Sequence, residues 1–134
     1  MKLKNFLILN AILFVPFGTG MLIMPGTIFP LFGIELDADG ILMARVFGSA
    51  LLSLGLICYL IRSEAAHSIG MGAVLFGNFV FHAIDSVSTF IASYSEVMNT
   101  LGWMFTGLHF VLALGFLYYY GSHKKHATLG KSKS

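Results

Sequence analysis

Four apolar segments, each about as long as a bilayer is thick, constrain the fold of this 134-residue chain more than any other feature. They run from about Asn5 to Met24, from Ile41 to Ile61, from Ser68 to Ala92 and from Leu101 to Tyr120. About 20 apolar residues in a helix cross a hydrocarbon core about 30 Å thick. None of the segments alternates polar and apolar residues with period two, so helices are predicted rather than a membrane barrel.

The composition agrees with a chain that lipid surrounds. Hydrophobic residues make up 57% of the sequence and charged residues 10%, whereas soluble domains average about 45–50% and about 25%. A small soluble domain needs charged residues to cover its large relative surface. The net charge of +2 gives no reason to expect a nucleic-acid partner. We therefore expect an all-α integral membrane four-helix bundle whose main partner is the lipid bilayer.

The breaks between the segments have the residues that end and begin helices. Pro25-Gly26 ends the first helix, because proline cannot continue the hydrogen-bond ladder and glycine loosens the backbone. The stretch from Thr27 to Ile34 is apolar but too short to cross the membrane again. It is predicted to be a short segment packed at the membrane surface. Asp37 or Asp39 can then cap the second helix.

The C-terminal part of the chain is predicted to leave the membrane at Gly121. Glycine there would end the fourth helix, and a polar, basic stretch follows it. Residues 1–121 would then form a single transmembrane domain, and residues 122–134 a flexible basic cytoplasmic tail.

The distribution of basic residues predicts the orientation. Seven of the eight lysines and arginines lie before the first span, between the second and third spans, or after the fourth. With four spans, these three regions share one side of the membrane. The opposite loops carry four acidic residues and no basic residue. Because basic loops stay in the cytoplasm, both termini are predicted to be cytoplasmic, in a bacterial inner membrane.

Two charged residues fall inside the predicted spans at similar depth. Arg45 lies about one turn inside the outer end of the second helix, and Asp85 lies in the outer half of the third. An unpaired charge there would cost several kcal/mol, so an Arg45–Asp85 ion pair is expected. The pair would either fix the two helices in register or belong to a functional site. Arg45 has a further option, since a long side chain can snorkel to the outer headgroups.

Two histidines and a polar stripe extend this cluster. His82 and His109 lie near the middle of their helices. Asn78, His82, Asp85 and Thr89 follow spacings of four, three and four, which place them on one face of the third helix. The candidate binding residues are therefore an intramembrane polar cluster: Arg45, Asn78, His82, Asp85 and His109.

Three interpretations of the cluster stay open. It can provide hydrogen bonds between helices that specify the bundle. It can form a small polar pocket for a substrate, a lipid headgroup or a proton, since ionisable groups inside a membrane tend to be functional. In the third interpretation, His82 and His109 ligate a haem axially. A metal site built from cysteine ligands is not expected, because Cys58 is the single cysteine.

Short apolar and glycine-containing motifs suggest a family. They are Ala44-Arg45-Val46-Phe47-Gly48, Leu51-Leu52-Ser53-Leu54-Gly55-Leu56, Gly102-Trp103 with His109, and Leu114-Gly115-Phe116. With them the chain resembles the small bacterial four-helix membrane proteins loosely grouped as DoxX-like, over most of its length. The resemblance implies a four-helix bundle that acts beside redox or stress-response partners.

The sequence contains no nucleophile elbow, phosphate loop, zinc-binding helix or dinucleotide turn. The first hypothesis is therefore a non-enzymatic accessory or binding subunit without a cofactor, which acts with another membrane protein or with a second copy of itself. One alternative is an oligomeric transporter or proton-coupled carrier of a small solute. A second alternative is a haem-binding or lipid-modifying membrane protein.

Overall fold

The computed structural model describes residues 1–66 and 68–131, with side chains up to His123, and all regular structure in these ranges is helical. The four long helices are α1 (Leu3–Ile23), α3 (Ala38–Ile61), α4 (Ile69–Tyr94) and α5 (Leu101–Lys131). Each contains a stretch long and apolar enough to cross a membrane. The predicted all-helical fold is confirmed, and the four predicted spans correspond to these helices.

The helix boundaries follow from local chemistry. α1 ends at Ile23, just before Pro25, as predicted. The side chain of Asp37 caps α3 by accepting a hydrogen bond of 2.8 Å from the backbone N–H of Gly40. Ser68 caps α4 in the same way, with its hydroxyl 3.1 Å from the backbone nitrogen of Met71. Each cap satisfies a backbone donor that has no partner within its own helix.

The apolar segment after α1 folds into two short helices, α2 (Pro25–Ile28) and η1 (Phe29–Phe32). Asn99, in the loop between α4 and α5, holds this segment by two hydrogen bonds. Its side-chain Nδ2 donates to the carbonyl oxygen of Leu31 at 2.9 Å, and its backbone N–H donates to that of Phe32 at 2.8 Å. Gly33 follows with a φ of +78°, a conformation that favours glycine. The segment therefore bridges the first and second halves of the chain.

The predicted end of the fourth helix at Gly121 is wrong. α5 continues through Gly121 to Lys131. A single glycine costs a helix only about 1 kcal/mol relative to alanine, and no proline follows to stop it. His123 also packs back on the bundle, with its Nε2 3.0 Å from the carbonyl oxygen of Ser68. The boundary expected between residues 121 and 122 is therefore not marked by the end of a helix, and residues 132–134 lie outside the described ranges.

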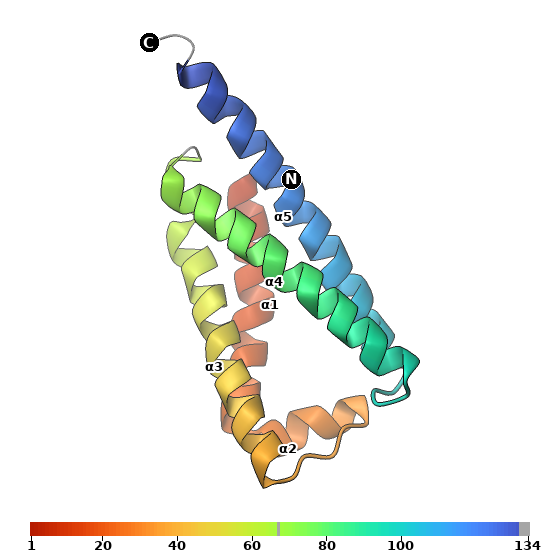
Figure 1. Ribbon diagram of the computed structural model, residues 1–134. Coiled ribbons are helices and arrows are strands. Elements are labelled where there is room, and N and C mark those ends of the chain that lie inside the picture. Colours follow the sequence, from red (N-terminus) through yellow and green to blue (C-terminus); the bar gives the residue numbers. More distant parts are fainter. Residues whose placement is uncertain (67, 132–134) are drawn as a thin grey trace.

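The long helices form two hairpins, in which α1 packs along α3 and α4 packs along α5 (Figure 1). The first hairpin is tight because Gly18 of α1 meets Gly48 of α3. A Cβ atom added to Gly48 would lie 2.7 Å from the carbonyl oxygen of Gly18. Small residues four positions apart on a helix can let two helices approach closely, and one such pair on α3, Ala44 and Gly48, is buried. Ser49–Ser53 and Ala73–Gly77 are instead exposed.

The two hairpins lie closest at the end that holds the N-terminus and diverge toward the end that holds α2 and η1 (Figure 1). At the close end, the ring of Phe6 meets that of Phe116 edge-on, with centroids 4.7 Å apart. These rings belong to one cluster of buried residues. At the open end, α2 and η1 span the distance between the hairpins. The predicted bundle is therefore formed by two hairpins joined at one end and bridged at the other.

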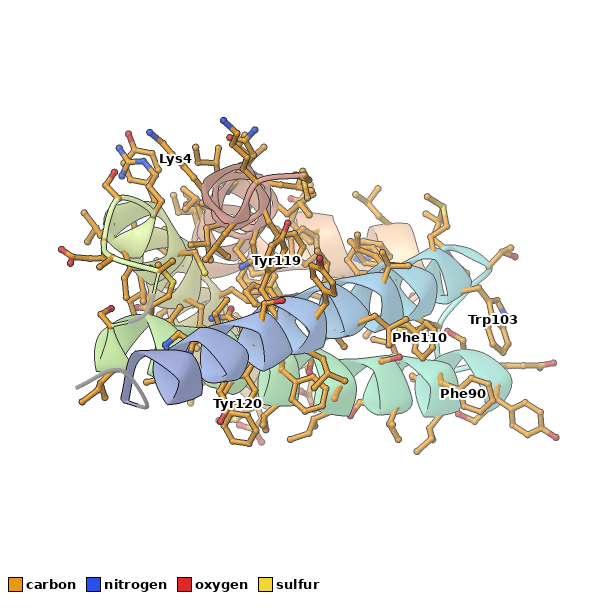
Figure 2. All side chains as sticks on the ribbon, turned by 90° about the horizontal axis from the view of Figure 1, so that it is seen from above. Lys4, Phe90, Trp103, Phe110, Tyr119 and Tyr120 are labelled. Atoms are coloured by element: carbon orange, nitrogen blue, oxygen red, sulfur yellow. The ribbon has the colours of Figure 1, made fainter. Side chains whose placement is uncertain are left out.

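Among the aromatic side chains labelled on the α4–α5 hairpin, Phe110 lies between Trp103 on one side and the two tyrosines on the other (Figure 2). Phe90 and Trp103 meet edge-on near the loop between α4 and α5, with ring centroids 5.6 Å apart. Tyr119 and Tyr120 lie farther along α5, toward its C-terminal end. Trp and Tyr prefer the boundary between lipid and water, so this distribution is the one expected of a helical hairpin that crosses a bilayer.

Candidate functional site

Four of the five predicted site residues come together, and Arg45 does not join them. Asn78, His82 and His109 are buried between the hairpins, and Asp85 lies beside His109. Arg45 is exposed on α3, and no ion pair connects it to Asp85 in the described part of the chain. α3 turns its Ala44 face toward α1, which leaves the neighbouring Arg45 outside. Similar predicted depth therefore does not place these two side chains face to face.

A chain of hydrogen bonds runs through the buried cluster and begins at a backbone carbonyl. The Nδ2 group of Asn78 donates to the carbonyl oxygen of Val74 at 2.9 Å, so its Oδ1 is left to accept. Asn10 of α1 turns its own Nδ2 toward that Oδ1 at 3.5 Å and toward the Sγ atom of Cys58 at 3.4 Å. Asn10 therefore presents its Oδ1 to His82, whose Nε2 lies 3.0 Å away.

This order of donors and acceptors fixes the tautomers of both histidines in their neutral form. The Oδ1 atom of Asn10 only accepts, so His82 carries its proton on Nε2 and its Nδ1 is an acceptor. The Nδ1 atom of His109 lies 3.0 Å from the Nδ1 atom of His82, so His109 is the donor. The hydrogen bond from Asn78 to the carbonyl oxygen of Val74 thus determines the order of donors and acceptors along the whole chain, which connects α4, α1 and α5.

Asp85 stands at the end of this chain without a hydrogen bond to its carboxylate in the described residues. Its Oδ2 is 3.8 Å from the Nδ1 atom of His109, which is longer than a hydrogen bond. Thr89, one turn further along α4, donates its hydroxyl to the backbone oxygen of Asp85 at 2.7 Å. Thr106 of α5 donates to the hydroxyl of Thr89 at 3.1 Å. The hydroxyl groups of Thr89 and Thr106 therefore donate their hydrogen bonds to other atoms than the Asp85 carboxylate.

The carboxylate faces a cavity of about 320 Å³ between the two hairpins. Phenylalanine rings from α1, η1, α3 and α5 form much of its wall: Phe14, Phe17, Phe29, Phe32, Phe47 and Phe105. The polar side chains among its described lining residues are Asp85, Thr89 and His109. The side chain of Asp85 keeps 20% of its surface exposed. The cavity is therefore apolar along most of its wall and polar at the Asp85 end.

Sequence reasoning missed Asn10 and gave Cys58 no part in the cluster. Asn10 is fully buried and connects α1 to both α3 and α4. Its signal was present, because an amide in the middle of an apolar span needs a hydrogen-bond partner inside the protein. Cys58 is buried and accepts a hydrogen bond from Asn10.

The arrangement of the histidines does not fit axial ligation of haem. A metal–imidazole bond is about 2 Å long, so two axial nitrogens are separated by about 4 Å across the metal. The nearest nitrogens of His82 and His109 are 3.0 Å apart and are hydrogen-bonded to each other. In the described residues, no group of three or more His, Cys, Asp and Glu side chains is arranged to hold a metal ion.

Comparisons with known protein families, with curated proteins and with solved structures find no match to this chain. The resemblance to DoxX-like proteins therefore stays a prediction.

Proposed function

We propose that this chain is a multi-pass membrane protein that binds a small, largely apolar ligand between its two helical hairpins. Asp85 and His109 would meet the polar end of the ligand, and the phenylalanine-lined wall would hold its apolar part. The charge distribution supports a bacterial inner membrane with both termini in the cytoplasm. In this arrangement the cavity lies in the outer half of the bilayer, under the α2–η1 segment.

The cavity is the observation that carries this proposal. Ligand sites in proteins are concave and mostly apolar, with volumes of about 300–1,000 Å³ and a few polar groups that fix the orientation of the ligand. The cavity of about 320 Å³ with Asp85, Thr89 and His109 at one end fits this description. A charged group inside a membrane also indicates a functional site by default.

Binding without catalysis is favoured over an enzymatic role. The hydrogen-bond chain that ends at His109 is occupied by bonds within the protein. In the described residues, no serine, threonine or cysteine side chain is hydrogen-bonded to either histidine, as the activation of a nucleophile would require. Cys58, the single cysteine of the sequence, is hydrogen-bonded to Asn10 and is not among the described residues that line the cavity. The chain is therefore proposed to be a binding or accessory subunit.

A proton-coupled carrier is the second candidate. The observation that favours it is the contiguity of His82, His109 and Asp85, which places three titratable groups in one row beside the cavity. Measuring proton flux across the membrane of proteoliposomes that contain the protein would distinguish the two candidates. A folded Asp85→Asn protein that loses flux favours the carrier, whereas the absence of flux in the wild-type protein favours the binding subunit.

Native mass spectrometry of the protein extracted from its own membrane in mild detergent tests the binding proposal. The key variant is Leu108→Trp. Leu108 lines the cavity, and the bulkier indole side chain of tryptophan would fill it. Leu114→Trp is the matched control, since Leu114 lies on the same helix and is exposed on the outside of the bundle. We expect one small molecule per chain in the wild-type and Leu114→Trp proteins and none in Leu108→Trp.

Two results would contradict the proposal. One is a wild-type chain that carries no small molecule. The other is a molecule bound to all three proteins in the same ratio, which would place it outside the cavity. The same spectra report whether the chain leaves the membrane as a monomer, as an oligomer of itself or with another polypeptide.

A further inference from the structure

We infer that the cavity selects a lipophilic monocation, an amine or quaternary ammonium attached to an apolar body. This inference rests on the proposed function, because it names the class of ligand for the same cavity. Its basis is the charge balance at the polar end of the cavity and the aromatic character of the wall.

The carboxylate of Asp85 accepts no hydrogen bond within the described structure, and its contact with His109 is an ion pair only when that histidine is protonated. The closest ionisable group on the facing helix is His109, whose Nδ1 lies 3.8 Å from Oδ2 of Asp85. The proton on that Nδ1 is directed to His82, which accepts it at 3.0 Å. A carboxylate in a medium of low dielectric constant is costly unless a counter-charge or a hydrogen-bond donor stabilises it. The site therefore lacks one positive or donating group.

The protein does not supply that group from the cavity wall. None of the described residues that line the cavity is a lysine or an arginine. Arg45, the cation nearest in predicted depth, is exposed on the outer face of α3. The missing counter-charge is thus expected to arrive with the ligand.

The aromatic wall strengthens the preference for a cation. Phe17, Phe32 and Phe105 form one group of rings on the wall, with centroid distances of 4.8 to 6.1 Å. The face of an aromatic ring carries partial negative charge and attracts a cation. An anion gains no such interaction, and the carboxylate repels it. A cation with an apolar body therefore matches both ends of the cavity.

A pair of isosteric probes tests the inference. One is a phenylbutyl-trimethylammonium ion, and the other is its neutral analogue, in which a tert-butyl group replaces the trimethylammonium group. Binding of each probe is measured by equilibrium dialysis of the full-length protein in nanodiscs of zwitterionic lipid, with empty nanodiscs subtracted. We expect the wild-type protein to bind the cation at least about tenfold more tightly than the neutral probe.

Variants assign that preference to Asp85. Asp85→Asn is expected to reduce the ratio of the two affinities to about one, and Asp85→Glu, which keeps the charge, to preserve the preference. Asp39→Asn is the matched control, because Asp39 is an exposed carboxylate in the first turn of α3. Circular dichroism checks the folding of each variant. The comparison of the two probes on the wild-type protein needs no variant, so the inference stays testable if Asp85→Asn does not fold.

The outcomes separate the inference from the proposed function. If neither probe binds the wild-type protein above the empty nanodiscs, the proposed function itself is overturned. If the neutral probe binds as tightly as the cation, or if a folded Asp85→Asn protein keeps the preference, the cavity stays a binding site and only the inferred charge is overturned.

Discussion

Replacing Asn10 with alanine should destabilise the protein more than any other single change of a polar residue in α1. Asn10 Oδ1 accepts from His82 Nε2 at 3.0 Å, and Asn10 Nδ2 lies 3.5 Å from Asn78 Oδ1. The alanine variant leaves a buried donor on His82 without a partner, which costs about 1–3 kcal/mol. The longer contact with Asn78 adds less, and measured hydrogen bonds between membrane helices average about 0.6 kcal/mol. We expect a loss of about 2 kcal/mol in the free energy of unfolding.

The assay is reversible unfolding by sodium dodecyl sulfate in mixed micelles, followed by circular dichroism. Asn5→Ala is the matched control, because Asn5 lies in the same helix and is exposed. A double-mutant cycle adds His82→Phe, which removes the stranded donor. In that background Asn10→Ala should cost about 1 kcal/mol less than in the wild-type protein. An Asn10→Ala protein as stable as Asn5→Ala, within about 0.5 kcal/mol, would refute the argument that this hydrogen-bond chain supports the bundle.

Three further predictions follow from the same structure. Gly48→Ala should destabilise the α1–α3 hairpin by about 1–3 kcal/mol, because the Cβ atom of the alanine would lie 2.7 Å from backbone atoms of α1. Thermal unfolding in detergent measures this loss of stability. The control Gly77→Ala meets no atom within 4 Å and should be neutral or stabilising by up to about 1 kcal/mol, so equal effects would contradict the close contact. The ¹⁵N spectrum of imidazole-labelled protein should show His82 protonated at Nε2 and His109 at Nδ1, and the opposite tautomers would break the donor order derived above. Asn99→Ala should raise the rate of hydrogen–deuterium exchange of the α2–η1 segment roughly fivefold, because the variant loses a hydrogen bond worth about 1 kcal/mol. The exchange rate within α1 should stay unchanged. Equal exchange of the segment in the wild-type and variant proteins would show that the Asn99 side chain does not hold it.

The spans and the cap of α3 were readable from the sequence because they depend on local properties. Length and apolarity alone identify a helix that can cross a bilayer, and Pro25 and Asp37 act within one turn of their own position. The end of α5 was not readable. Gly121 is a weak signal by itself, and the contact that carries the helix further involves His123 and a residue 55 positions earlier.

The candidate site was predicted in part, because helical periodicity shows which residues share a face but not which face meets which helix. Asn78, His82 and Asp85 were correctly grouped on α4. The expected partner Arg45 was wrong, since the Gly18–Gly48 contact rotates α3 so that Arg45 faces outward. Asn10 was overlooked because a single amide in an apolar run has no periodic pattern. The cavity itself depends on the divergence of the two hairpins, which no local signal in the sequence encodes.

Photolabelling in a native-like bilayer tests the central claim, that the space between the hairpins is a ligand site, most directly. A hydrophobic diazirine probe with a tertiary amine is added to the protein in nanodiscs, activated by light and mapped by peptide mass spectrometry. The account predicts labels on cavity residues such as Phe14 and Phe105, and their loss in the presence of an excess of the same molecule without the diazirine. Labels confined to residues exposed on the outside of the helices, such as Ile12 and Val111, and insensitive to that competitor would contradict it.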